Sequence, residues 1–187
     1  MVLGFLRTLF NRLQHVGYPL SFADAKSGEE FVDLVPEEHR YRIGPFYCDT
    51  SPDSHPGDYQ HAIDFLVKDG SFVYSARSGV VTDVVESHDQ YGSGPEYSSF
   101  LNYVTIEHDG YYSQYAHLQK DSPSSYGIQV GKPVVRGQVI GTVGKSGWVD
   151  FGERDGKAHF IDHLHFMLFR NTRDGFESIP VIFKETV

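Results

Sequence analysis

Two histidines separated by a single residue, His163 and His165, carry the clearest chemical signal in this sequence. On a β-strand, residues i and i+2 point to the same side, so both imidazoles would project from one face while Leu164 and Phe166 point to the other. The two residues would lie roughly 6.6 Å apart along the strand. They could bind one metal ion together, or one could bind the ion while the other exchanges protons beside it. The pair therefore predicts a metal or acid–base site.

A carboxylate and a third histidine extend this pattern. Asp64 stands in the apolar run Ala62–Phe65, where a charge is costly unless it is paired, hydrogen-bonded or bound to a metal. His117 ends the strand-like run Tyr111–His117. One carboxylate and three imidazoles on strands would form a zinc site with a free coordination position. Zinc in such a site lowers the pKa of a bound water to about 7, which makes hydroxide available for hydrolysis.

The composition agrees with a site built from imidazole and carboxylate. The 187 residues include ten histidines but one cysteine, Cys48, which rules out an intramolecular disulfide framework and a cysteine-based zinc knuckle. Sixteen Lys and Arg against 25 Asp and Glu give a net charge of −9, and no segment forms a basic stripe. Nucleic acid and anionic membrane surfaces are therefore not expected as partners.

The elements that must position these residues are β-strands. From about residue 40 onward, short runs rich in Val, Ile, Tyr, Phe and Thr alternate with Gly, Pro, Asp and Ser. Asp109 and Gly110 form a strong hairpin signal between two such runs. We expect a mainly β, antiparallel fold without βαβ units. The predicted strands are Ser71–Ala76, Val80–Glu86, Tyr103–His108, Tyr111–His117, Val134–Val135, Val139–Val143 and His163–Arg170.

The N-terminal part has a different pattern. Apolar residues at offsets of three and four predict a short amphipathic helix within Met1–Val16, followed by a polar connector that includes Ser21–Glu30. We expect residues 1–35 to pack as an appendage on a β domain formed by residues 36–187. Basic residues interrupt the apolar run near the N-terminus, so it does not look like a secretory signal, and no segment reaches the roughly 18 apolar residues of a membrane-spanning helix.

Several segments occur in the same order as in a known protein family. They are Asp64, Gly70–Val81, Asn102–Gly110, Tyr115–Leu118, Val130–Val134, Gly137–Gly141 and His163–Phe166. Over about residues 55–170 this series resembles the lysostaphin-like (LytM-type) zinc metallopeptidases. The resemblance implies a sandwich-like antiparallel core with a duplicated motif. It also implies hydrolysis of peptide bonds in bacterial peptidoglycan, and a location in the periplasm or at the cell surface.

The resemblance also implies roles for individual residues. In that family, zinc is bound by the His and Asp of an H-x-x-x-D motif and by the second His of H-x-H. Asp64 and His165 would therefore be zinc ligands, and His163 and His117 would be the catalytic imidazoles. The first position of the motif is here occupied by Gln60, whose neutral amide is a poor zinc ligand.

Three interpretations of the missing ligand follow. We take His61 as the expected third ligand, although its offset of three from Asp64 directs it to the opposite face of a regular strand unless a bulge re-aims it. His55, in the preceding loop, is an alternative. The third interpretation is that no tight zinc site remains.

Residues Trp148–Asp162 depart from the family pattern as a charged insertion before His163. This insertion either reshapes the substrate groove or forms a loop that extends into solvent, and we expect the solvent-exposed loop. Tyr91, Tyr97, Tyr103 and Trp148 are aromatic residues that could line a peptide groove, although most aromatic residues of a β-rich chain serve packing.

We therefore expect a zinc-dependent peptidase with a peptide substrate. One alternative is a family member that has lost the metal and acts as a cell-wall-binding or hydrolase-regulating module. A second is a cupin-like metalloenzyme in which both His163 and His165 bind the ion.

Overall fold

The computed structural model describes residues 14–50 and 55–184. The amphipathic helix expected within Met1–Val16 lies outside these residues except for its last three, which form strand β1 (Gln14–Val16). The described residues contain no helix long and apolar enough to cross a membrane.

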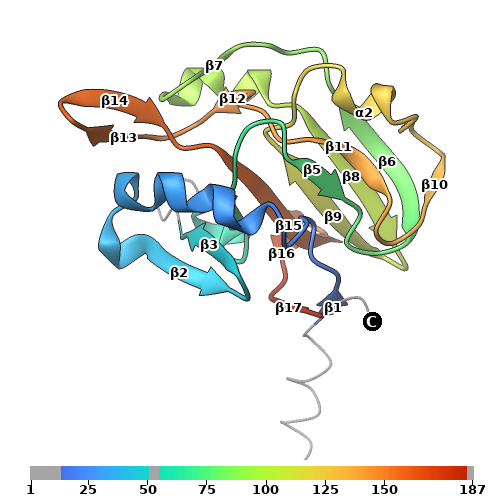
Figure 1. The fold of residues 1–187 in the computed structure, drawn as a ribbon. Coiled ribbons are helices and arrows are strands. Elements are labelled where there is room, and N and C mark those ends of the chain that lie inside the picture. The colour runs from blue at the N-terminus through green and yellow to red at the C-terminus, as the bar shows by residue number, and fades with distance from the viewer. Residues whose placement is uncertain (1–13, 51–54, 185–187) are drawn as a thin grey trace, which may run out of the picture.

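A nine-stranded antiparallel sheet is the largest element of the described part of the chain. Eight strands follow one another across this sheet and a ninth, β16, pairs with β15 (Figure 1). Their order is β10 (Pro133–Val134), β6 (Gly79–Val85), β8 (Tyr103–His108), β9 (Tyr111–Ala116), β15 (His163–Thr172), β4 (Ile63–Leu66), β3 (Phe46–Asp49) and β2 (Arg40–Ile43), with β16 at Gly175–Ser178. The predicted mainly antiparallel β fold is thereby confirmed.

Smaller pairs of strands and short helical segments surround this sheet. The pairs are β1 with β17 (Val181–Phe183), β5 (Phe72–Tyr74) with β11 (Val139–Thr142), β7 (Tyr91–Gly92) with β12 (Gly147–Trp148), and β13 (Phe151–Arg154) with β14 (Lys157–Phe160). The helical segments are η1 (Ala25–Leu34), η2 (Glu37–His39), η3 (Gly57–Tyr59), η4 (Pro95–Phe100) and α2 (Ser122–Ser125). Within the described residues every helical segment after residue 40 is therefore short, as the sequence predicts.

The hairpin between β8 and β9 forms where the Asp109–Gly110 pair predicts it. Asp109 has a φ of 54° and Gly110 a φ of 86°. Positive φ at both central residues is what a tight hairpin turn with the twist of the flanking strands requires. The turn sets the register in which Tyr103 lies opposite Ala116, and so fixes where the chain leaves β9 for His117.

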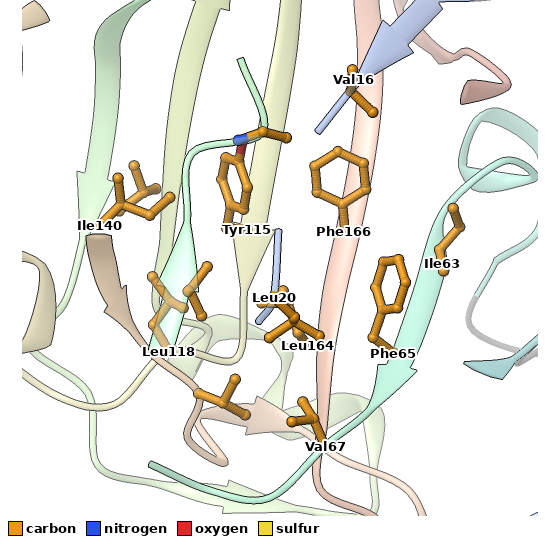
Figure 2. Packing of buried hydrophobic residues seen from close by; sticks show 14 of the residues in the cluster. Val16, Leu20, Ile63, Phe65, Val67, Tyr115, Leu118, Ile140, Leu164 and Phe166 are labelled. Carbon is orange, nitrogen blue, oxygen red and sulfur yellow. The ribbon is translucent and has the colours of Figure 1, made fainter. Parts of the chain in front are cut away.

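The main core lies on one face of the large sheet. Leu164 and Phe166 of β15 are fully buried there, beside Phe65 of β4 and Tyr115 of β9 (Figure 2). The pair β5–β11 covers the same face, with Ile140 in the same buried cluster, which gives the sandwich-like arrangement. Because side chains alternate along a strand, the residues between these core positions point to the opposite face of the sheet.

The N-terminal segment packs closely on the β domain. Val16 and Leu20 belong to the main core, and β1 pairs in parallel with β17 near the C-terminal end. The expected polar connector instead contains the 3₁₀ helix η1, which buries Phe31 and Leu34 against Leu66. The helix forms there because its few apolar residues gather on one side and find a hydrophobic surface. The division at residue 35 stays a prediction.

A buried polar chain links β8 and β9 beneath the hairpin. Nδ1 of His108 donates to the carbonyl oxygen of Ser78 at 2.8 Å, so the neutral ring leaves Nε2 to accept from the Ser113 hydroxyl at 2.7 Å. The Ser113 and Tyr115 hydroxyls lie 3.0 Å apart, and the Tyr115 hydroxyl accepts from the amide of Ala76 at 2.8 Å. Burial lowers the pKa of His108, which favours the neutral ring.

We expect Tyr115→Phe to lower the free energy of unfolding by about 1–3 kcal/mol, because it leaves the amide of Ala76 without a partner inside the core. Urea unfolding checks this as a shift of the midpoint at constant slope. The control is Tyr112→Phe on the same strand, where the ring stacks on Phe169 with a centroid distance of 5.3 Å and keeps that contact. Equal stability of the two variants would contradict the role of the Tyr115 hydroxyl.

Candidate active site

Adjacent strands place two of the predicted residues directly opposite each other. The antiparallel register of β4 and β15 pairs Asp64 with His165. Opposed residues of antiparallel strands have Cβ atoms about 4.5–5.5 Å apart, so side chains on the same face meet. His163 lies two residues earlier on the same face, while the alternating Leu164 enters the core. The strand arrangement expected from the H-x-H motif is therefore present.

Three side chains converge on one point at this face. Nδ1 of His165 lies 2.9 Å from Oδ1 of Asp64, and Nε2 of His55 lies 3.3 Å from the same oxygen. The two ring nitrogens are 3.2 Å apart. The side chains of His55 and Asp64 are buried, and that of His165 is 12% exposed. Among the described residues, these are the three whose potential ligand atoms all lie within 4.8 Å of one another.

The electrostatics of this cluster favour an ionised Asp64. Burial opposes the charge, but His163 and His55 nearby, together with hydrogen bonds from His165 and His55, hold the pKa of Asp64 well below its usual range. Burial also opposes a charge on His55 and by itself lowers the pKa of this ring. The carboxylates of Asp64 and Asp49 outweigh this effect, so that the pKa of His55 is raised overall. The cluster therefore presents one negative oxygen and two ring nitrogens.

The geometry of His55, Asp64 and His165 fits a zinc ion. Ligand atoms of a tetrahedral zinc lie about 3.3 Å from one another, because each is about 2.0–2.2 Å from the ion. Hydrogen bonds alone do not satisfy the observed triangle. If both rings donate a proton to Asp64, no proton remains for the contact of 3.2 Å between the two ring nitrogens. A cation at the centre would satisfy all three atoms.

The structure does not bring His61 to this cluster. Strand β4 begins only at Ile63, and His61 lies in the turn before it, where its backbone amide donates to the Ser178 hydroxyl at 3.0 Å. Its side chain and that of Gln60 line a separate hollow that also includes Glu177. His61 could bind the same ion as Asp64 only if an irregularity of the chain turned its side chain to the face of Asp64. The turn does not do this. His55, the alternative from the preceding loop, occupies the third position instead.

His117 and His163 stand beside the cluster with matching orientations. Nδ1 of His117 lies 2.8 Å from the Ser146 carbonyl oxygen, and Nδ1 of His163 lies 2.8 Å from that of Ile161. A carbonyl oxygen can only accept, so Nδ1 carries a proton in both rings, and Nε2 is the acceptor of a neutral ring. The ring centroids are 4.5 Å apart, and Nε2 of His163 is 3.9 Å from Oδ1 of Asp64.

His117 adopts an uncommon backbone conformation, with a φ of 60°. A residue other than glycine at positive φ is unusual and is found at functional sites, where the surrounding structure holds it in place. Burial, reinforced by the nearby His163 and His165, lowers the pKa of His117 well below its usual value. Its ring is therefore neutral at pH 7.

Asn102 supports this conformation from behind. Its side-chain amide donates to the carbonyl oxygens of His88 at 2.7 Å and Leu118 at 3.2 Å, and its carbonyl oxygen accepts from the amide of His88 at 3.0 Å. The backbone amide of Asn102 donates to the hydroxyl of Ser146, the residue whose carbonyl fixes the ring of His117. The fully buried Asn102 thus ties three loops together around the site, two through its side chain and one through its backbone amide.

A cleft of about 270 Å³ opens in front of the imidazoles. The base of the insertion lines it through Trp148, Asp150 and Ile161, while the rest of the insertion forms the projecting β13–β14 hairpin (Figure 1). The other lining residues are Asp49, Tyr59, Asp64, Leu66, Ser98, Leu101, Gln114, His117, His163 and His165. The insertion therefore contributes to the cleft wall as well as extending into solvent.

The structure thus gathers four of the five predicted site residues, which are Asp64, His117, His163 and His165. Sequence reasoning missed Asn102, for which an asparagine next to a strand is the only signal. It also missed Asp49 and Asp150 at the cleft. Of the four aromatic residues considered for a groove, Trp148 lines the cleft, whereas Tyr91 contacts Phe160 of the hairpin at a centroid distance of 5.1 Å.

Comparison with known proteins gives a family and several similar structures. The sequence model of peptidase family M23 matches residues 58–175. No curated protein matches the chain. The catalytic domain of lysostaphin from Staphylococcus simulans is 26% identical over 63% of this chain and 74% of its own, with a TM-score of 0.42. A zinc-containing peptidase from Vibrio cholerae is 25% identical over 78% of this chain and 37% of its own, with a TM-score of 0.43.

A third similar structure is the catalytic domain of EnpA, a prophage-encoded M23 protein from Enterococcus faecalis. It is 22% identical over 79% of this chain and 95% of its own, with a TM-score of 0.47. The chain covers only 40% of lysostaphin in its solution structure.

We expect Asn102→Ala to lower the free energy of unfolding by about 2–4 kcal/mol, because it leaves buried backbone groups of two loops without partners. The exposed Asn171 of β15 provides the control, since Asn171→Ala should change stability by less than about 0.5 kcal/mol. Urea unfolding of both variants measures the difference. A loss for Asn102→Ala no larger than that of the control would show that the network does not hold the site together.

Proposed function

The chain belongs to peptidase family M23, and we propose that it is a zinc-dependent endopeptidase that hydrolyses peptide bonds in bacterial peptidoglycan. The observation that supports this proposal most directly is the convergence of His55, Asp64 and His165 beside the paired imidazoles of His117 and His163. Two imidazoles and one carboxylate form the type of ligand set found in catalytic zinc sites, which keep one coordination position open.

His55, Asp64 and His165 would hold the ion. When bound, zinc supplies a Lewis acid that polarises a carbonyl group and lowers the pKa of water. The protein contributes the orientation of its ligands, because Asp64 and His165 lie on paired strands whose other faces are packed in the core. The sheet thus holds the ligand atoms of Asp64 and His165 in place.

The two remaining imidazoles are placed to handle protons. Amide hydrolysis requires one proton to leave the attacking water and one to reach the departing nitrogen. Nε2 of His163 and Nε2 of His117 can accept the first and deliver the second, because both Nδ1 atoms are occupied by backbone carbonyls. A protonated ring at either position would also stabilise negative charge on the carbonyl oxygen.

The ligand assignment makes a direct prediction about zinc content. We expect His55→Ala to reduce bound zinc well below one ion per chain, because it removes one of the three converging atoms. His61→Ala should keep about one zinc per chain, since His61 lies in a separate hollow. Elemental analysis of the purified and zinc-reconstituted proteins measures both.

The same measurement distinguishes the proposed enzyme from the alternative, a binding module that has lost the metal. Gln60 favours this alternative, because its neutral amide is a poor zinc ligand. Unaltered zinc content in His55→Ala together with loss in His61→Ala would reverse the ligand assignment. Failure of the unmutated protein to take up zinc after reconstitution would favour the binding module.

We expect His163→Ala to retain zinc and to lose about 10²–10⁴-fold in turnover, the range that a general acid or base contributes. The readout is release of free amino groups from purified peptidoglycan, with zinc content measured in parallel. His159→Ala, on the exposed face of the β13–β14 hairpin, is the control and should retain activity. Loss of zinc from His163→Ala equal to that from His165→Ala would instead support the cupin-like site in which both histidines bind the ion.

A further inference from the structure

The two imidazoles beside the metal cluster are oriented by carbonyl groups from two separate segments. The carbonyl oxygen of Ser146 accepts from Nδ1 of His117, and that of Ile161 accepts from Nδ1 of His163, both at 2.8 Å. A ring held in this way keeps its Nε2 atom in place only while its carbonyl partner keeps its own position. Whatever ties the two segments together therefore determines how the two rings face each other.

An ion pair joins these two segments. Lys145 directly precedes Ser146 in the sequence, and Asp162 directly follows Ile161. Nζ of Lys145 lies 3.2 Å from Oδ1 of Asp162. Resting on the peptidase function proposed above, we propose that Lys145 is a positioning residue. It keeps the carboxylate of Asp162 in place and thereby holds the two imidazoles in their working orientation.

Asp162 depends on this ammonium group because its side chain is only 9% exposed. Oδ2 accepts from the backbone amide of Asp69 at 3.2 Å, whereas Oδ1 accepts no hydrogen bond of regular geometry in the described part of the chain. The charge of Lys145 therefore compensates Oδ1 for the water that it has lost. Burial lowers the pKa of Lys145, but Asp162 and Asp69 outweigh this effect, so that the pKa is raised overall and the side chain is a cation at pH 7.

The pair lies behind the site and not in the cleft. Lys145, Asp69 and Asp162 line a hollow of about 430 Å³, whose lining also includes residues of η1 and of the β13–β14 hairpin. The described lining of the cleft in front of the imidazoles includes none of the three. Lys145 therefore does not touch a substrate in the cleft, and it can affect the reaction only through the groups that it holds.

The other lysine and arginine side chains at this hollow are paired with η1. Lys68, in the loop after β4, forms an ion pair with Glu30, and Arg154 of the β13–β14 hairpin forms one with Asp33. These contacts anchor the loop and the hairpin to η1. Neither cation is free to replace the ammonium group of Lys145 beside the buried carboxylate.

Asp69 extends the link to the segment that carries His117. Its Oδ2 lies 3.5 Å from Nζ of Lys145, and its Oδ1 accepts from Nε2 of Gln119 at 2.6 Å. The amide of Gly144, the residue before Lys145, donates to the carbonyl oxygen of His117 at 2.7 Å. The ammonium group thus lies where the segments of both imidazoles meet.

Removal of the ammonium group has a definite physical consequence. In Lys145→Met the buried carboxylate of Asp162 is left uncompensated unless it takes up a proton or turns toward solvent. Turning moves its neighbours Ile161 and His163, and with them the ring. Asp162→Asn removes the charge and keeps an acceptor for the amide of Asp69. Lys145→Met should therefore have a much smaller effect when Asp162→Asn is already present.

Turnover of solubilised peptidoglycan and zinc content are the first readouts. We expect Lys145→Met to keep about one zinc per chain and to lower kcat about ten- to hundredfold, as for a catalytic group displaced by a fraction of an ångström. KM should not change, because Lys145 makes no contact in the cleft. Lys145→Arg should retain most of the activity, since it keeps the positive charge.

The matched control is Lys68→Met, which removes a cation from the same hollow but from a pair that holds neither imidazole. This variant should keep its kcat. Circular dichroism at the assay temperature checks that each variant is folded. Lys145→Gln, which retains a polar chain end, replaces Lys145→Met if the latter does not fold.

A spectroscopic measurement reports ring orientation without turnover. Proton NMR with isotope-labelled histidine detects the Nδ1–H groups of His117 and His163, assigned by their absence from His117→Ala and His163→Ala. We expect both signals to broaden in Lys145→Met through faster exchange with water. The Nδ1–H group of His108, which donates to the carbonyl oxygen of Ser78, is an internal reference and should not change.

Unchanged kcat and unchanged imidazole signals in Lys145→Met would overturn the proposal. A loss of kcat by the same factor with and without Asp162→Asn would also overturn it, and so would an equal loss in Lys68→Met. Loss of zinc from Lys145→Met would assign its effect to the metal ligands instead. A protein that hydrolyses no peptidoglycan would refute the proposed peptidase, while the imidazole signals would still decide the role of Lys145.

Discussion

A buried carboxylate determines how the whole site is arranged. The Asp64 side chain is 5% exposed on a short strand in the interior of the sheet. An ionised group there is tolerated only with partners that compensate for the water it has lost. Those partners are three imidazoles from two places in the chain, namely His55 in a loop and His163 and His165 on the neighbouring strand. The face of the sheet that lines the cleft is organised around meeting this requirement.

The hydrophobic core and the site are two faces of the same strands. Leu164 and Phe166 are held in the core by contacts that include Phe65, and Phe65 itself adjoins Asp64 on β4 (Figure 2). A shift of register by one residue would exchange the faces and place the imidazoles in the core. Hydrophobic packing therefore fixes the positions of the polar groups that face the cleft.

Much of this arrangement could be predicted from periodicity. Strands such as Tyr103–His108 and the pair His163 and His165 follow the two-residue alternation, and the glycine-containing turn at Asp109 identifies its hairpin. Loops carry no such period. For that reason the sequence left His55 as one of several options, and the preference for His61 rested on its nearness to Asp64 along the chain alone.

Contacts between segments that are distant in the sequence could not be predicted either. The charged residues of the insertion suit a solvated loop as well as they suit the β13–β14 hairpin, and only the tertiary structure shows Arg154 paired with Asp33. In the same way, the expected connector became η1 because Leu66 and Ile161 offer it an apolar surface. The sequence shows Asn102 only as an asparagine next to a strand, since its importance depends on three loops that meet only after folding.

The anchoring of the hairpin to η1 means that the structural unit that builds the site is larger than the region that identifies the family. The family match covers residues 58–175. His55 precedes that region, and so do η1 and β1. Residues of η1 contact the cleft wall through Arg154 and Asp33. The partner of β1 is β17, which lies after the C-terminal end of the matched region. A fragment cut at the limits of the match would keep the H-x-H strand and its core. It would lose one proposed metal ligand and the support of the wall that faces it, so domain exchange or grafting with relatives has to carry residues from both flanks.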